Sequence, residues 1–413
     1  MAGVVVLAAL AVACVGSLPF TLASAGRDAG GRTLPERYKH GVLDAALLPP
    51  TWAPMTPDEL RRLDGVARRR ALEADLAIAF DMRGIQSAAP RLEDLPEPER
   101  EAVRAHRPTF VFGTDRLGRD LLIRCLAGGG VSIGIGLAAA AISVVIGTLY
   151  GAAAGYMGGR IDGLMMRAVD VLYGLPYVLL VVLLAVAGDA IIDRAVRARA
   201  EEAEERRHQW LTAEVMREAR GAGAPVTVER AGDLLSTNPE LRRRLESEAA
   251  RHPALGSGEI PAGLRTTLEV GVLLVAIGGL SWLTMARVIR GQVLSLKERP
   301  FVEAARAMGA GRGWVFARHL LPNLVGPIIV YATLTVPQAI LQESFLSFLG
   351  IGVREPLPSW GSLAAEGLVE LNPVRVRWWL IVFPCLLLGA TLLSLNFVGE
   401  GLRRAFDPRR AAT

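Results

Sequence analysis

The sequence is poor in residues that build disulfide frameworks and metal sites. It holds three cysteines in 413 residues, Cys14, Cys125 and Cys385, and their spacing matches no disulfide, zinc or redox motif. We therefore expect neither a metal nor a bound cofactor. The glycine-rich phosphate-binding pattern G-x-x-x-x-G-K-[ST] is also missing. If this chain takes part in ATP-driven work, another subunit must hydrolyse the ATP.

Lysine is almost absent as well, since Lys39 and Lys297 are the only two. Arginine carries nearly all of the positive charge, a bias that fits genome base composition better than function. The formal net charge is only +5, and its meaning depends on where the arginines lie. We expect no nucleic-acid partner.

Apolar residues, by contrast, are abundant and clustered. They make up 51% of the chain, and the mean hydropathy is +0.34. Each cluster approaches the roughly 20 residues that a helix needs to cross a bilayer. The sequence predicts an all-α integral membrane protein with six transmembrane helices, near 3–23, 131–155, 168–188, 267–286, 325–346 and 378–398.

The first apolar stretch has a second interpretation. It ends in Ala23-Ser24-Ala25, which fits a signal-peptide cleavage site, but no positive segment precedes Val4. A retained helix is the favoured interpretation.

Two long hydrophilic blocks interrupt the apolar pattern. Charged residues cover most faces of their helical segments, which is typical of solvated segments outside the bilayer. The apolar heptad positions that a coiled coil requires are not present. The sequence therefore predicts a first transmembrane helix within 1–26 and an extracytoplasmic block at 27–125. Two transmembrane helices follow within 126–189, then an extracytoplasmic insertion at 190–264 and three transmembrane helices within 265–413.

Charge placement predicts the orientation. The connection at 287–318 carries seven basic residues against Glu298 and Glu303, and the carboxyl-terminal tail adds four arginines. The positive-inside rule places this connection and the tail in the cytoplasm. Counting six spans then puts the amino terminus in the cytoplasm and both hydrophilic blocks outside.

The cytoplasmic connection contains the stretch "EAARAMGAGRGWVFARHLLPN", from Glu303 to Asn323. Pro300 and Glu303 suit the first turn of a helix, and Gly309 is a stop signal. A second short helix is predicted from about Trp314 to Leu321, ending before Pro322. The first helix should present one small apolar face, formed by Phe301, Ala304, Ala305 and Met308.

This hairpin has two interpretations from physics alone. It could lie on the membrane surface as an amphipathic helix, or it could enter a groove of a soluble partner. The small residues of its apolar face favour the partner, because they allow close backbone approach.

The stretch resembles the EAA loop of ABC importer permeases. Glu303-Ala304-Ala305, Gly309 and Leu321-Pro322 match that motif, and "RHLLPN" at 318–323 is close to the peptide-importer version. Four further stretches resemble the dipeptide/oligopeptide permeases of the C-subunit type, in the same order: 112–126, 155–176, 347–367 and 378–408. The block 27–125, except its end, and the insertion at 190–264 have no counterpart in that pattern.

The resemblance implies a fold, a function and partners. The fold would be the six-helix ABC type I importer permease fold, with two large extracytoplasmic insertions, in the bacterial inner membrane. The function would be the permease subunit of a peptide importer, coupled through the EAA loop at 297–323 to cytoplasmic ATPases. Its partners would be those ATPases, a second permease in a heterodimer, an extracytoplasmic solute-binding protein and membrane lipid.

Other candidate residues lie within the spans. Gly147, Gly151 and Gly155 form a small-residue stripe suited to helix packing, within the chain or against a second permease. Gln342 and Glu343 either line the pathway or bond a neighbouring helix.

A hydrolase is the alternative function. Gly130 to Gly134 fit G-x-S-x-G with Ser132 as nucleophile. However, the histidines all lie between the predicted spans, so no base is expected at the depth of Ser132.

Overall fold

The protein is described by a computed structural model that covers residues 2–26, 33–73, 92, 95–252, 255, 260–372 and 375–405. Over these ranges the regular structure is helical, in agreement with the predicted class. The predicted tail beyond Ala405 and parts of both hydrophilic blocks lie outside the described residues. The long helices are α1 (Ala2–Gly16), α5 (Leu121–Met157), α7 (Tyr177–Gly221), α10 (Ala262–Leu296), α13 (Leu321–Phe348) and α15 (Trp379–Ala405).

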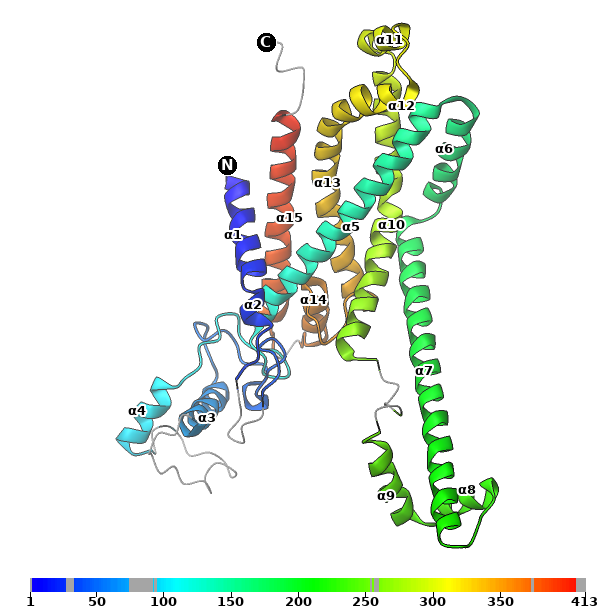
Figure 1. The fold of residues 1–413 in the computed structure, drawn as a ribbon. Coiled ribbons are helices and arrows are strands. Elements are labelled where there is room, and N and C mark those ends of the chain that lie inside the picture. Colours follow the sequence, from blue (N-terminus) through cyan, green and yellow to red (C-terminus); the bar gives the residue numbers. More distant parts are fainter. Residues whose placement is uncertain are drawn as a thin grey trace. The chain divides into compact units, whose positions relative to one another are not determined.

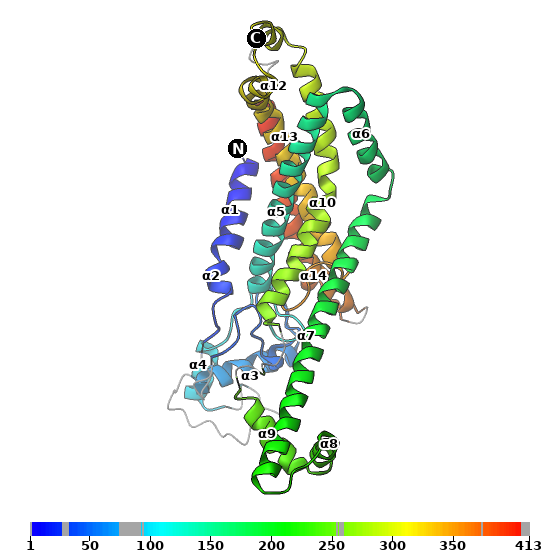
Figure 2. The same ribbon diagram turned by 45° about the vertical axis from the view of Figure 1, so that its right-hand side comes forward.

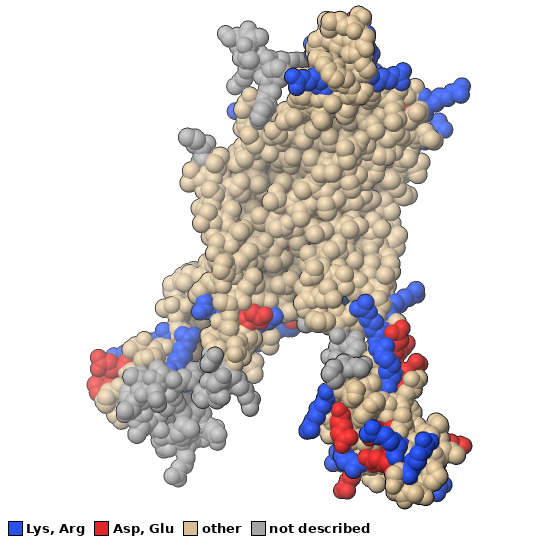
Figure 3. Space-filling view, in the orientation of Figure 1, with Lys and Arg blue, Asp and Glu red and all other residues tan. Residues whose placement is uncertain are grey.

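Five stretches of the described chain are long and apolar enough to cross a membrane. They are Gly3–Thr21, Leu121–Met157, Gly263–Leu296, Arg312–Phe348 and Trp379–Ala405. A sixth arises if α6 (Gly159–Tyr173) and α7 together make one span, although they meet at 85°. Figure 3 shows a broad band on its face of the molecule where the described side chains are neither basic nor acidic.

The third predicted span, 168–188, runs from the end of α6 into the start of α7 and is interrupted between them. The chain breaks at residues 174–176, between α6 and α7. Pro176 explains the break, since proline lacks an N–H and disfavours helical geometry at the preceding residue. Beyond the break, α7 does not stop near 188 but continues to Gly221, because its charged half is rich in the strong helix formers Ala, Arg and Glu.

Helix α5 begins ten residues before the predicted span. The Asp120 carboxylate caps it by accepting hydrogen bonds from the backbone N–H groups of Leu122 (2.8 Å) and Ile123 (3.4 Å). The glycine run 128–130 then stays helical. A Cβ at Gly129 would come within 2.5 Å of the Trp360 ring, so the run permits a close helix contact that the sequence pattern did not reveal.

Contacts divide the chain into two units, Met1–Val182 with Leu273–Thr413, and Leu183–Val272. In the first unit α5 packs on α13 and α1, and α15 packs on α1, α13 and the short helix α14 (Trp360–Val369) (Figures 1 and 2). A short α2 (Leu18–Thr21) follows α1, and α11 (Pro300–Ala307) and α12 (Arg312–Val315) join α10 to α13.

Within the first unit, the two ends of the helices carry different structures. Figure 1 shows α11, α12, the amino end of α1 and the carboxyl end of α15 toward one end. The opposite end holds α14, the turn η1 (Leu43–Ala45), α3 (Pro57–Glu73) and α4 (Glu97–Ala105). The hydrophilic block at 27–125 is folded in part, because Leu48, Leu63, Val66 and Phe110 form a small buried core within it.

The second unit also has a core of its own. The end of α7 packs with α8 (Val228–Thr237) and α9 (Pro239–Ala249) around Leu211, Leu235 and Leu245. The insertion, predicted to carry charge on most of its helical faces, therefore also has apolar faces that pack against one another.

Candidate functional site

The EAA loop begins with the predicted helix, α11. Pro300 occupies its first turn and Glu303 lies in the same turn, exposed. Gly309 ends the segment with a φ of +86°, a left-handed conformation that side chains disfavour. Met308, Gly309 and Ala310 close the turn through backbone hydrogen bonds to Ala304, Arg306 and Ala305.

The structure divides the apolar face predicted for α11 into a covered part and an exposed part. Only Ala305 of the four predicted residues is buried, together with Val302. Phe301, Ala304 and Met308 are exposed, and Met308 is 81% exposed. Helical periodicity found the apolar side of the helix, but it could not tell which residues the rest of the chain would cover.

The second helix of the hairpin does not end before Pro322. The chain passes from α12 through a single π-helical turn (Phe316–Leu320) directly into α13. Pro322 lies in the first turn of α13, where a missing N–H costs no hydrogen bond. Leu321 and Pro322 are both exposed. The EAA loop is therefore continuous with the fifth predicted span.

The inner side of the EAA loop is embedded in a hydrophobic cluster. Val302, Ala305, Val315 and Leu320 pack with residues of three long helices, namely Ala152 of α5, Met285, Ile289 and Val293 of α10, and Leu324 of α13. Two hydrogen bonds add to this packing. Tyr156 donates to the Arg312 carbonyl (2.5 Å), and Lys297 donates to the Gly155 carbonyl (3.0 Å). Close-packed side chains transmit displacement, so the loop and these helices should move together.

His319, whose contact the sequence left unknown, lies between two aromatic rings. Its ring centroid is 5.1 Å from Trp314 and 6.0 Å from Phe301. Both aromatic side chains are exposed.

The glycine stripe of α5 faces α10. A Cβ at Gly151 would lie 2.2 Å from the Ala286 carbonyl oxygen, and one at Gly147 would lie 2.5 Å from Met285 Cβ. A Cβ at Gly155 would lie 2.9 Å from the Arg290 carbonyl oxygen. The stripe therefore packs inside this chain, the first of the two alternatives left open by the sequence.

Gln342 lines a cavity of about 330 Å³ between the α6–α7 break, α10 and α13. Its carboxamide oxygen accepts a hydrogen bond from the Tyr177 hydroxyl (2.7 Å). The same hydroxyl lies 2.9 Å from Ser281 Oγ. The Tyr177 hydroxyl thus links the start of α7 to α10 and α13.

Glu343 points into a different environment, because successive helical residues lie about 100° apart. It is 0% exposed. Ser347 donates to its Oε1 (2.7 Å) and Ser344 donates to its Oε2 (3.3 Å). This geometry favours helix bonding over a place on the pathway.

Ser132 is fully buried, and its hydroxyl accepts a hydrogen bond from the Trp360 backbone N–H (3.3 Å). Its contacts are those of helix packing at the α5–α14 junction. The hydrolase alternative has no support.

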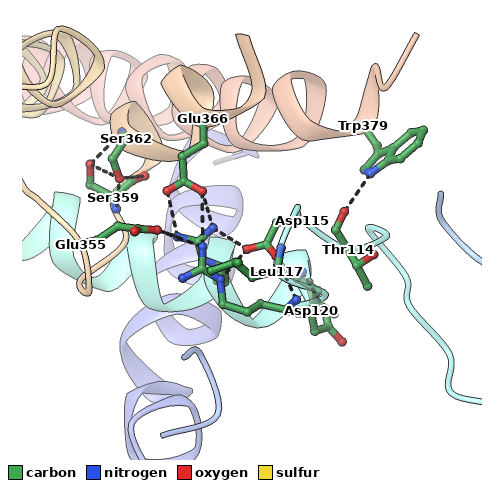
Figure 4. A network of polar contacts seen from close by, with 12 residues as sticks. Thr114, Asp115, Leu117, Asp120, Glu355, Ser359, Ser362, Glu366 and Trp379 are labelled. Carbon is green, nitrogen blue, oxygen red and sulfur yellow. Dashed lines mark hydrogen bonds and ion pairs between the residues drawn. The ribbon is translucent and has the colours of Figure 1, made fainter. Parts of the chain in front are cut away.

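A buried charge network that no sequence motif indicated lies at the opposite end from the EAA loop (Figures 1 and 4). Arg124, 1% exposed, donates to Asp115 (2.8 Å) and forms two bonds to Glu366 (2.6 and 2.9 Å). Arg119 pairs with Asp115 (2.6 Å) and Glu355 (2.9 Å). The network joins the first turn of α5 and the segment before it to α14 and to the loop that precedes α14. Its signal was the pattern of charges at 115–124, next to an apolar run.

Comparisons with known proteins agree on one family. The family described as "Binding-protein-dependent transport system inner membrane component" matches residues 143–412. The chain is 36% identical over 298 residues to the oligopeptide transport system permease protein OppC of Haemophilus influenzae, covering 72% of this chain and 70% of that protein. It is 35% identical to the dipeptide transport system permease protein DppC of Bacillus subtilis, covering 72% and 68%. For OppC of Salmonella typhimurium the identity is 37%, covering 82% and 87%.

Proposed function

Since this chain belongs to the family of binding-protein-dependent transport system inner membrane components, we propose that it forms, together with a second permease, the translocation pathway of an ATP-driven importer. Its relatives are oligopeptide and dipeptide permeases, so peptides or related small solutes are the proposed cargo. The chain is a permease subunit and not the catalytic subunit of the transporter.

The observation that supports this mechanism is that one side of the EAA loop is exposed and the other side is buried. Its outer side presents four exposed residues that we call the docking face, namely Phe301, Ala304, Met308 and Trp314. Its inner side is fixed to α5, α10 and α13 through buried packing. A cytoplasmic ATPase that binds the docking face would therefore move these helices with it. For ATP to drive transport, the ATPase must bind the loop with different free energy in its two states.

Within this proposal the chain has six spans, with α6 and α7 forming one bent span. Both termini and the EAA loop are cytoplasmic. The arginine-rich connection supports this orientation, and so does the location of α11, the start of α1 and the end of α15 toward one end of the helices (Figure 1). The block at 27–125 and the insertion at 190–264 would then be extracytoplasmic.

The proposed partners follow from this arrangement. Two cytoplasmic ATPases bind below the membrane, a solute-binding protein delivers cargo outside, and a second, different permease completes the pathway. Exposed leucine, valine and phenylalanine side chains along the long helices provide the surface for that permease and for lipid.

Cross-linking tests the docking face. A cysteine in place of Met308, which is exposed, should cross-link to the ATPase in the assembled importer, with a yield that changes when ATP is bound. A cysteine in place of Ala305, which is buried, should not. Cys385 is the exposed native cysteine, so both variants should carry Cys385→Ser. Equal cross-linking at both positions, or none at Met308, would contradict the proposed docking.

A further inference from the structure

The cavity beside the α6–α7 break differs from the other features of the chain because it combines polar lining with a break in a membrane helix. Its lining includes Tyr177, Ser281, Thr284, Gln338 and Gln342. Figures 1 and 2 show the junction of α6 and α7 beside the middle of α10. Irregular backbone at membrane depth is tolerated only where protein buries it or where it borders a water-filled cavity.

The lining residues offer hydrogen bonds but carry no formal charge. Six of the lining residues have a hydroxyl or carboxamide group, and the other five are leucines. The volume, about 330 Å³, falls at the lower end of the range for small-molecule pockets. Such a lining can form hydrogen bonds with the main-chain amides and carbonyls that all short peptides share. It offers no charged group that would favour or disfavour a charged peptide side chain.

The geometry around Gln342 orients its carboxamide. Tyr177 donates to the carboxamide oxygen at 2.7 Å, and Ser281 lies 3.4 Å from the same atom. These contacts engage the oxygen, and the amide nitrogen still carries two hydrogens for donation. Gln338, one turn earlier on α13 and exposed, adds a second carboxamide to the same wall.

We propose that this cavity is a transit site for the peptide main chain within the translocation pathway. The inference rests on the proposed function, because it assigns the cargo a place in this chain. A pathway must bind its cargo well enough to admit it and weakly enough to release it. A fixed charge would hold peptides of opposite charge and repel those of like charge, whereas uncharged donors and acceptors bind both weakly.

Introducing a charge tests the proposal. The complete importer, with its ATPases, partner permease and solute-binding protein, is reconstituted in vesicles with Gln338→Glu, Gln338→Lys or the neutral control Gln338→Met. Uptake of labelled Ala-Glu-Ala and Ala-Lys-Ala is measured for each. Every rate is divided by the wild-type rate for the same peptide, which removes any preference of the binding protein.

Gln338→Glu should slow the acidic peptide about tenfold more than the basic one, and Gln338→Lys should reverse the order. Gln338→Met should change both rates by one common factor. Where a Gln338 variant does not assemble, Thr284→Glu and Thr284→Lys place the same charges on the α10 wall.

Equal relative rates for the two peptides in the assembled charge variants would overturn the transit site. Uptake of neither peptide by the wild-type importer, with ATP present, would instead contradict the proposed peptide function. The two failures are therefore distinguishable.

Discussion

Replacing Arg124 by methionine removes the centre of the buried charge network and keeps a side chain of similar length. Arg124 makes three hydrogen bonds, two to Glu366 and one to Asp115. Removing one partner of a buried ion pair costs about 3–5 kcal/mol, because the remaining charge stays buried and unpaired. Asp115 keeps Arg119, and Glu366 is 22% exposed, so we expect a loss near the lower limit, about 3 kcal/mol.

The assay is thermal unfolding in detergent micelles, followed through the helical circular dichroism signal, with a double-mutant cycle. Arg124→Met combined with Glu366→Met replaces the ion pair by apolar side chains and should recover at least about 1 kcal/mol of the single-variant loss. Arg116→Met, at an exposed arginine beside Asp115, should stay within about 0.5 kcal/mol of wild type. The reasoning is refuted if Arg124→Met costs less than about 1 kcal/mol or if the two losses simply add.

Three further outcomes are expected. Gly151→Leu should lower the unfolding free energy by about 1–3 kcal/mol or more, because even its Cβ would meet the Ala286 carbonyl. Gly134→Ala, at an open position of the same helix, should be neutral or slightly stabilising; similar melting temperatures for both would contradict this packing. Glu343→Gln should leave uptake per folded importer within about twofold of wild type, since the carboxyl group bonds buried serines. A loss of uptake by a stable importer would show that Glu343 takes part in the pathway. Leu320→Ala opens a cavity under the EAA loop and should raise the number of ATP molecules hydrolysed per peptide imported. An unchanged ratio would show that this packing does not couple ATP hydrolysis to peptide import.

The sequence supplied the class and the coupling segment because both depend on local patterns. A run of about 20 apolar residues must be a helix in lipid, whatever surrounds it. Pro300, Glu303 and Gly309 likewise specify a short helix and its end through their own backbone chemistry. These features needed no knowledge of distant contacts.

Other features depend on which segments meet in space. Val302 and Ala305 are the residues of α11 that pack in a buried cluster with α5 and α10, and helical periodicity alone did not identify this buried pair. Gln342 and Glu343 are neighbours in sequence, yet one lines a cavity and the other bonds buried serines.

The sequence by itself determined an all-helical membrane protein, the place of the EAA loop between two spans and the small residues that permit close packing. Only the tertiary structure decided which side of the loop is exposed, where the glycine stripe packs and how Arg124 pairs with Glu366, 242 positions away. The physical reason is that helix formation depends on backbone hydrogen bonds between residues four positions apart in the chain. Burial and charge pairing depend on contacts that exist only after the chain has folded.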